Sequence, residues 1–394
     1  MKKLSLLSIF TLLAACGSDD DKGTPSCEID QIDIAVQTVA PDYSSSAVAL
    51  ACSEEAGIID NLLEKSDSDY TISAGSDRFY HIGKSGIDTI AQYNYDTYSL
   101  QNWQYSTNAD NEEGSSNPYK ILEVSNNKAF IIRYNKPQVW VVNPSATSAE
   151  DFYVNSLDLT NYLGTYEVTN ESEETTTVNE TTVNVADAII VNNKLFIAMQ
   201  RIGANYNYAN DSKVAIFNVE TLTEINTENT TGENAITLNG HNVQALSSTD
   251  NYVYVASRGN YGNDYGQLEK ISLNDYTLST VLEGSADLGH ISNVQSISDT
   301  QLYVLGNYSG YNSESEYVYQ YNLLQVNAQT KEIKENISAF KGDNIADIAL
   351  ADDNNLWIAS GNKSKPGIYE IDTTNNRQLT FIPTNLNPSS IIFK

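Results

Sequence analysis

Three loops of the chain combine tyrosine, asparagine, glycine and arginine as ligand-recognition surfaces do. They span 201–210, 258–266 and 307–312, and each follows an apolar stretch. Tyrosine buries a large area at low entropic cost and carries a hydroxyl, and asparagine adds hydrogen-bonding capacity. We predict a contact surface of six loop tyrosines with two arginines at its edge: Tyr206, Tyr208, Tyr261, Tyr265, Tyr308 and Tyr311, with Arg201 and Arg258. Two other interpretations stay open: the tyrosines stack on one another, and the arginines only neutralise nearby carboxylates.

Residues suited to catalysis are sparse. The chain has three histidines, His81, His241 and His290, and they are far apart in the sequence. No Ser/His/Asp or Cys/His arrangement accompanies them. A thiolate metal site is a poor interpretation as well, because few cysteines and histidines are available for it. We therefore expect no enzymatic activity, no cofactor and no bound metal.

Charge and composition narrow the class of protein. Fifty-one acidic residues against 22 basic ones give a net charge of −29, which would repel the phosphates of a nucleic acid. Yet 40% of the residues are hydrophobic and 26 are tyrosines, so the chain should fold rather than stay an acidic disordered tail. We expect an all-β protein that acts as a monomer and binds no nucleic acid.

A short phrase recurs along the chain: asparagine, an apolar residue or proline, two variable residues and an aliphatic one. Its copies begin at Asn117, Asn184, Asn242, Asn293, Asn344 and Asn387, with a degenerate copy at Asp69. A polar turn follows each copy except the last, and then an aromatic–aliphatic strand such as 252–255. With two further strands, each unit has four short strands in about 50 residues, the period of a β-propeller. Strands at this spacing could also form a β-sandwich, but a β-sandwich has no reason to repeat one sequence phrase this often.

The ends of the chain set the number of blades. Six complete units run from about residue 69 to 383, which leaves one strand at 387–393 and about three strands at 28–64. Together these make a seventh blade, and pairing the C-terminal strand with N-terminal strands removes the free sheet edges. We predict a seven-bladed β-propeller with four-stranded antiparallel blades over 28–394, carrying an exposed Thr/Glu-rich insertion at 165–184.

In this arrangement the three tyrosine-rich loops join second to third strands, on the face where the inner strands begin. They lie on consecutive blades, so their tyrosines would gather on one side of the central opening. The repeated asparagines occupy the same face. We expect them to cap turns by bonding neighbouring backbone rather than to touch a ligand.

The N-terminus predicts export and lipid anchoring. Met1, Lys2 and Lys3 precede an apolar run over 4–13 that is too short to span a bilayer, and small residues then lead to Cys16. This is a secretory signal, and the stretch Leu-Ala-Ala-Cys resembles the lipobox of bacterial lipoproteins. The resemblance implies cleavage after residue 15 and a lipid on Cys16. The alternative is an ordinary signal peptide with an incidental cysteine.

The residues after Cys16 refine the expected location. Residues 16–27 include three consecutive aspartates and read as an acidic flexible tether. Gly17 stands where, in lipoproteins, an aspartate would favour the inner membrane, so the resemblance implies the outer membrane. Whether the protein faces the periplasm or the medium stays open.

The other two cysteines should form a disulfide. Cys27 and Cys52 remain once Cys16 is lipidated, an even number in an oxidising compartment. They flank two apolar stretches separated by a polar turn, and an antiparallel hairpin would bring them together at its open end. Closing a loop of this length should add roughly 3 kcal/mol.

As a whole, the chain resembles the YncE-like seven-bladed propellers. The likeness depends on the Ile371-Asp372-Thr373-Thr374 turn and on the repeated Asn-Pro or Asn-Val dipeptides. Surface lipoproteins that capture vitamin B12-type ligands are similar in architecture, lipid anchor and tyrosine-rich loops. The resemblance implies a non-catalytic envelope protein that captures a small ligand, with an outer-membrane transporter as one recipient. One alternative is a scaffold that docks an outer-membrane protein, and another is a calcium-dependent lactonase-like propeller hydrolase.

Overall fold

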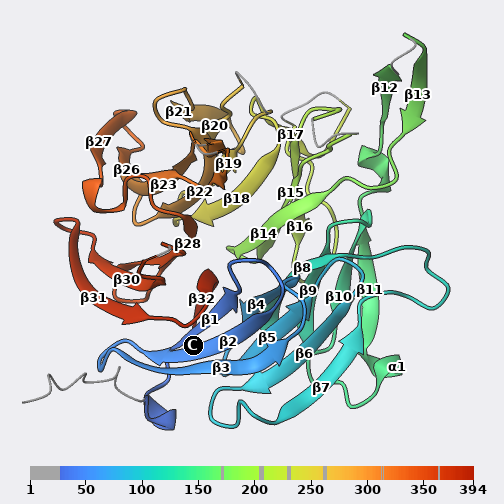
Figure 1. The fold of residues 1–394 in the computed structure, drawn as a ribbon. Helices are drawn as coiled ribbons and strands as arrows, with labels where there is room; N and C mark the ends of the chain where they lie inside the picture. The colour runs from blue at the N-terminus through green and yellow to red at the C-terminus, as the bar shows by residue number, and fades with distance from the viewer. Residues whose placement is uncertain are drawn as a thin grey trace, which may run out of the picture.

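The chain closes into a ring of seven four-stranded antiparallel blades, as Figure 1 shows in a computed structural model. The structure describes residues 27–169, 173–203, 208–228, 232–260, 264–311, 313, 315–362 and 364–394. The proposed signal peptide, Cys16 and most of the tether therefore lie outside the described residues. So do Tyr206 and Tyr261. Within the described part of the chain, no helix is long and apolar enough to cross a membrane.

The first four blades follow the chain in order, and within each blade the strands run from the centre of the ring outward. Blade 1 comprises β4 (Tyr70–Ala74), β5 (Arg78–Gly83), β6 (Thr89–Asn94) and β7 (Gln101–Ser106). Blade 2 comprises β8 (Pro118–Ser125), β9 (Lys128–Arg133), β10 (Gln138–Val142) and β11 (Tyr153–Asp158). Blade 3 comprises β14 (Val185–Val191), β15 (Lys194–Met199), β16 (Lys213–Asn218) and β17 (Ile236–Thr237). Blade 4 comprises β18 (Val243–Ser248), β19 (Tyr252–Ser257), β20 (Gln267–Ser272) and β21 (Leu278–Glu283).

The last three blades complete the ring. Blade 5 comprises β22 (His290–Ser296), β23 (Gln301–Asn307), β26 (Tyr321–Asn327) and β27 (Glu332–Asn336). Blade 6 comprises β28 (Ile345–Leu350), β29 (Leu356–Ser360), β30 (Gly367–Asp372) and β31 (Arg377–Pro383). Blade 7 joins β32 (Asn387–Phe393) to β1 (Ile34–Val39), β2 (Ser46–Cys52) and β3 (Gly57–Lys65). The predicted closure is confirmed, because the C-terminal strand β32 pairs antiparallel with β1.

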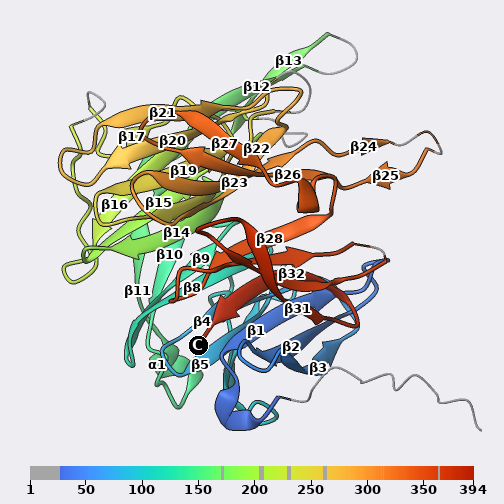
Figure 2. The ribbon, with the colours of Figure 1, turned by 90° about the vertical axis from the view of Figure 1, so that its left-hand side faces the viewer.

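Two further hairpins and a few short helical turns decorate the blades. The hairpin of β12 (Thr165–Thr169) and β13 (Thr175–Asn179) occupies the predicted insertion, and most of its side chains are exposed. The hairpin of β24 (Gly310–Tyr311) and β25 (Tyr317–Val318) extends from blade 5. Both project beyond the body of the ring in Figure 2. The α-helix α1 (Ala149–Phe152) links β10 to β11, and three 3₁₀ turns are η1 (Ile29–Gln31), η2 (Thr160–Tyr162) and η4 (Ser338–Phe340).

The core consists of seven apolar clusters, one between each pair of neighbouring blades. Alternate residues of a strand point to opposite faces of a blade, so each inner strand can contribute to two interfaces. Trp357, Tyr254 and Tyr303 are fully buried in such interfaces. The repeated aromatic–aliphatic strands therefore supply the packing between blades.

The predicted disulfide is present between Cys27 and Cys52, with a Cα–Cα distance of 5.7 Å. In the β1–β2 hairpin Ile34 pairs with Ala51, so Cys52 lies at the open end, and Cys27 precedes the 3₁₀ turn η1 that leads into β1. Both cysteines are buried in the cluster between blades 7 and 1. The disulfide thus ties the start of the described chain to the blade that closes the ring.

Candidate functional site

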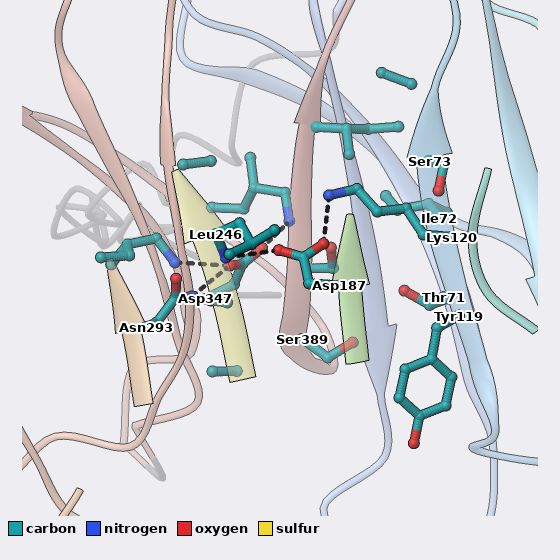
Figure 3. A pocket seen from close by; sticks show the side chains of 18 of the residues that line it. Thr71, Ile72, Ser73, Tyr119, Lys120, Asp187, Leu246, Asn293, Asp347 and Ser389 are labelled. Atoms are coloured by element: carbon teal, nitrogen blue, oxygen red, sulfur yellow. Dashed lines mark hydrogen bonds and ion pairs between the residues drawn. The ribbon is translucent and has the colours of Figure 1, made fainter. Parts of the chain in front are cut away.

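A cavity of about 710 Å³ lies on the axis of the ring, and all seven inner strands contribute to its wall. Figure 3 shows its interior, where polar groups from neighbouring blades meet. Asp187 of β14 and Asp347 of β28 are the two aspartates in this wall. Lys120 of β8 and Asn293 of β22 are among the groups near them.

Polar side chains in this wall connect consecutive blades. Asp187 accepts a hydrogen bond from the backbone N–H of Leu246 in the next blade, with an N–O distance of 2.8 Å. Asp347 likewise accepts a hydrogen bond from the backbone N–H of Ile391 in the next blade, with an N–O distance of 3.0 Å. The hydroxyl of Ser73 accepts from the N–H of Ile121 at 3.2 Å. These contacts satisfy inner-strand N–H groups that face the cavity and have no further strand to pair with.

The two aspartates differ in their counter-charge. Asp187 contacts the Lys120 ammonium at 2.7 Å, whereas the side-chain donors near Asp347 are neutral, among them the Asn293 amide at 3.3 Å. Enclosure by the ring raises the pKa of Asp347 to about 6, while hydrogen bonds from Ile391, Ile348, Ser390 and Asn293 oppose this rise. The carboxylate is nevertheless half-buried rather than sealed, because it borders the central cavity.

Three of the repeated asparagines hold turns. Asn117, Asn184 and Asn242 have positive φ angles of 49°, 52° and 59°, a region that asparagine tolerates better than most residues. Asn117 accepts from the N–H of Ser85 through its side-chain oxygen, and Asn184 accepts from that of Ile202. Asn242 donates to the carbonyl of Gly259. These contacts agree with the predicted capping role.

The histidines serve packing and loop contacts. His81 is buried, and burial lowers its pKa to about 3. The face of the ring where the inner strands begin carries the tyrosine-rich loops, and we call it the loop face. There Tyr208 stacks on His241 with ring centroids 3.8 Å apart. The ring centroids of Tyr265 and His290 are 4.9 Å apart. Among the residues that the structure describes, no group of three or more His, Cys, Asp or Glu side chains could hold a metal ion.

The structure places the two predicted arginines in different environments. Arg201 is buried, and its guanidinium lies 3.2 Å from a Glu180 oxygen. It also donates to the backbone carbonyl of Asp211. Arg201 therefore helps to fix its loop. Arg258 instead lines a pocket on the same face of the ring.

This tyrosine pocket has a volume of about 560 Å³ and is lined by Tyr317, Tyr319, Tyr321, Arg258, Asn307, Ser292 and Gln244. Tyr317 and Tyr319 are 44% and 45% exposed, with ring centroids 5.3 Å apart in an edge-to-face arrangement. Gln244 also lines the central cavity, so the two spaces adjoin. Their volumes fall within the range of small-molecule sites.

The predicted Tyr308 and Tyr311 belong to the same loop, but the three tyrosines of the pocket were not predicted. Tyr311 is 78% exposed and contacts Tyr317 edge-on. Tyr308 is half-buried, and burial raises its pKa. The missed signal is the alternation of tyrosines at 317, 319 and 321. In an extended segment, residues two apart point to the same side, so this spacing predicts one tyrosine-covered face.

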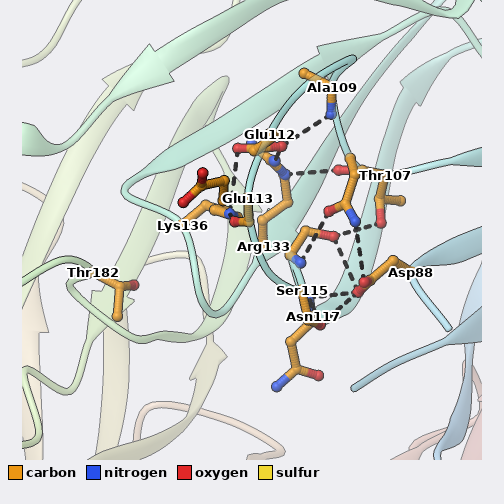
Figure 4. A network of polar contacts seen from close by, with 12 residues as sticks. Asp88, Thr107, Ala109, Glu112, Glu113, Ser115, Asn117, Arg133, Lys136 and Thr182 are labelled. Atoms are coloured by element: carbon orange, nitrogen blue, oxygen red, sulfur yellow. Dashed lines mark hydrogen bonds and ion pairs between the residues drawn. The ribbon is translucent and has the colours of Figure 1, made fainter. Parts of the chain in front are cut away.

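Arg133 shows why an arginine at the end of a strand is not always available to a ligand. Its guanidinium pairs with Glu112 and donates to the Thr107 carbonyl at 3.0 Å. The neighbouring carboxylate of Asp88 accepts from the Ser115 hydroxyl at 2.7 Å. Figure 4 shows how this network ties the loop between β7 and β8 to blade 2.

Comparison with known proteins supports the fold alone. No family model and no curated protein sequence matches the chain. A candidate 6-phosphogluconolactonase from Bacteroides fragilis superposes with a TM-score of 0.60 at 11% identity, over 93% of this chain and 99% of that one. A protein from Lactobacillus plantarum gives 0.59 at 14% identity, over 92% and 99%. The dihydro-heme d1 dehydrogenase NirN gives 0.52 at 10% identity, over 94% and 77%. The chain is a seven-bladed β-propeller, and its likeness to these structures is one of fold.

Proposed function

We propose that this protein is a non-catalytic binding protein of the cell envelope that captures a small ligand in the tyrosine pocket. Lipid on Cys16 would tether it to the outer membrane, where it could deliver the ligand to a transporter. The observation that carries the proposal is the pocket itself: about 560 Å³, lined by three tyrosines from one extended segment and adjoining the axial cavity.

The chemistry of the lining supports binding more than bond breaking. The tyrosine rings offer flat apolar faces, and Asn307, Ser292 and Gln244 offer neutral hydrogen-bonding groups. Arg258 adds a cationic group suited to a carboxylate or phosphate on the ligand. No histidine and no carboxylate lines the described part of this pocket, so a general base for lactone hydrolysis is not supplied there.

One observation favours the scaffold alternative. The β24–β25 hairpin presents Tyr311 at 78% exposure beside Tyr317 and Tyr319. Exposed tyrosines on a projecting hairpin are also suited to the centre of a protein interface. A docked outer-membrane protein would then cover the pocket instead of receiving a ligand from it.

The test is native mass spectrometry of the protein purified from its own cell envelope. We expect a bound small molecule on the wild type and its loss from a Tyr317→Ala/Tyr319→Ala variant, with a Tyr43→Ala variant as the matched control. Tyr43 is 59% exposed and lies in the β1–β2 turn, so it controls for loss of an exposed ring.

Three results would contradict the proposal. Recovery of an outer-membrane protein without a small molecule would support scaffolding. Hydrolysis of 6-phosphogluconolactone above the uncatalysed rate would support the lactonase alternative. Retention of the small molecule by the double variant would place the site elsewhere. Replacing Cys16 by serine should release the protein from the membrane without changing capture.

A further inference from the structure

A second cavity, separate from the tyrosine pocket, lies at the outer edge of the ring between blades 1 and 2. Its volume is about 420 Å³, and four aromatic residues line it: Tyr105 of β7, Trp140 of β10, Phe152 of α1 and Tyr153 of β11. In Figure 1, α1 lies beside β7 and β11 at the periphery. We call this space the aromatic cavity.

The aromatic walls are held in place. Tyr105 packs on Phe152 with ring centroids 4.7 Å apart, and its hydroxyl donates to the Ala146 carbonyl at 3.0 Å. Tyr153 meets Trp140 edge-on at 5.0 Å. Phe152 is buried, but Tyr153 is 45% exposed. A large part of one ring is therefore open to an incoming group.

The loop that forms the opposite wall is also fixed. Asn108 lines the cavity and donates to the Asp88 carboxylate at 3.1 Å, while its oxygen accepts from the Ser116 N–H at 3.0 Å. Glu112 accepts from the Ala109 N–H at 3.0 Å and pairs with Arg133. Figure 4 shows this network. A wall that is already ordered costs little conformational entropy when a ligand binds.

The charges at the aromatic cavity are negative. Asp110 and Glu150 line it, both are exposed, and neither is in an ion pair with another described residue. No lysine or arginine is among the described residues of the lining. An anionic ligand would therefore be repelled, and a cationic one attracted.

The nearby arginine occupies a different aromatic face. The Arg133 guanidinium lies over the Trp140 ring at 4.3 Å and is itself neutralised by Glu112. Its side chain is 1% exposed, so it does not present charge to the cavity. Among the described residues, no lysine or arginine covers Tyr105 or Tyr153.

We propose that the aromatic cavity binds an organic cation, an alkylated ammonium group seated against Tyr153 and Tyr105 with Asp110 and Glu150 as counter-charges. Aromatic faces attract such cations through the ring quadrupole, and alkyl groups on the nitrogen lower the cost of leaving water. A purely apolar ligand would gain nothing from the two carboxylates. This inference is independent of the proposed function, because the two sites share no lining residue.

The test is a titration of the full mature chain with choline, followed by calorimetry or NMR. As a neutral isostere, 3,3-dimethylbutan-1-ol has the same shape without the charge. We expect saturable choline binding in the millimolar range and at least several-fold weaker binding of the alcohol. Tyr153→Ala should weaken choline binding about tenfold, whereas Tyr153→Phe should keep most of it because the ring remains.

A variant with Asp110→Asn and Glu150→Gln should also weaken choline binding, and the loss should shrink at high salt. Tyr43→Ala and Tyr317→Ala/Tyr319→Ala should bind choline like the wild type. Absence of saturable choline binding would overturn the proposal. Equal binding of choline and the alcohol would show an apolar cavity with no preference for cations. Unchanged binding in both the Tyr153→Ala and the carboxylate variants would place the cation elsewhere.

Discussion

The polar side chains of the central cavity and those of the tyrosine pocket differ in what they contact. Asp187 and Asp347 accept hydrogen bonds from the backbone of the next blade. Tyr317 and Tyr319 contact each other edge-on and leave nearly half of their surface exposed. The two aspartates connect blades, whereas Tyr317 lies in the β24–β25 hairpin and Tyr319 directly follows it, outside the seven blades. Stability should therefore depend on the inner strands, and recognition on the loop face.

The strongest test of this difference is removal of the strand that closes the ring. Deleting Asn387–Lys394 removes β32, its pairing with β1 and its side chains in the cluster between blades 6 and 7. Because net stabilities are only about 5–15 kcal/mol, we expect the truncated chain to lose its cooperative thermal transition in circular dichroism.

The control for the truncation is Lys394→Ala, which alters the chain end but keeps β32. This variant should melt close to the wild type, because Lys394 lies beyond the strand. A truncated protein that melts cooperatively within a few degrees of the wild type would show that the ring does not depend on this closure.

The repeat made the fold predictable because its signal is local. Each copy of the asparagine phrase is followed by a turn and an apolar strand, and the leftover strands at the two ends imply the shared blade 7. The hydrogen bonds that Leu246 donates to Asp187 and Ile391 donates to Asp347 could not be predicted in the same way. Their donors are backbone groups on another blade, and only the closed ring places them within reach.

The candidate site was predictable in part. The sequence composition pointed to the loop face and to the loop after β23, but the three tyrosines that line the pocket lie where that loop returns to β26. Arg201 and Arg258 look alike in the sequence, yet Arg201 is paired with buried Glu180 and Arg258 lines the pocket. The sequence does not show that Arg201 pairs with Glu180, which lies 21 residues before it. Ligand contact by the predicted residues remains a prediction.

A smaller effect should come from the charge of Asp347. Its pKa in the folded protein is about 6, above the ordinary value of 3.8. The stability that protonation contributes is therefore fully present below about pH 4 and is lost as the pH rises through 6. Because water in the central cavity solvates the half-buried carboxylate, we expect a loss of only about 1 kcal/mol.

Urea unfolding of the wild type and of Asp347→Asn at pH 4 and pH 7 measures this effect. The wild type should lose about 1 kcal/mol relative to the variant between these pH values. His81 titrates in both proteins and cancels in the comparison. Asp352→Asn removes an exposed turn carboxylate and should show no such change. A constant difference between the wild type and Asp347→Asn would mean that Asp347 keeps its charge throughout this range.

The smallest effect on stability should come from the tyrosine pocket. An edge-to-face ring pair contributes about 0.5–1.5 kcal/mol beyond its buried area, and the Tyr317–Tyr319 pair should be at the low end because nearly half of each side chain is exposed. Tyr317→Ala/Tyr319→Ala should thus lower the free energy of unfolding by less than about 1 kcal/mol.

Tyr303→Ala is the contrasting variant, since Tyr303 is fully buried between blades. Its truncation should lower the free energy of unfolding by about 3–5 kcal/mol, by analogy with other large buried aromatics. If the double pocket variant were destabilised as much as Tyr303→Ala, the pocket tyrosines would be packing residues. The proposed distinction, in which the blades provide stability and the tyrosine pocket provides recognition, would then be wrong.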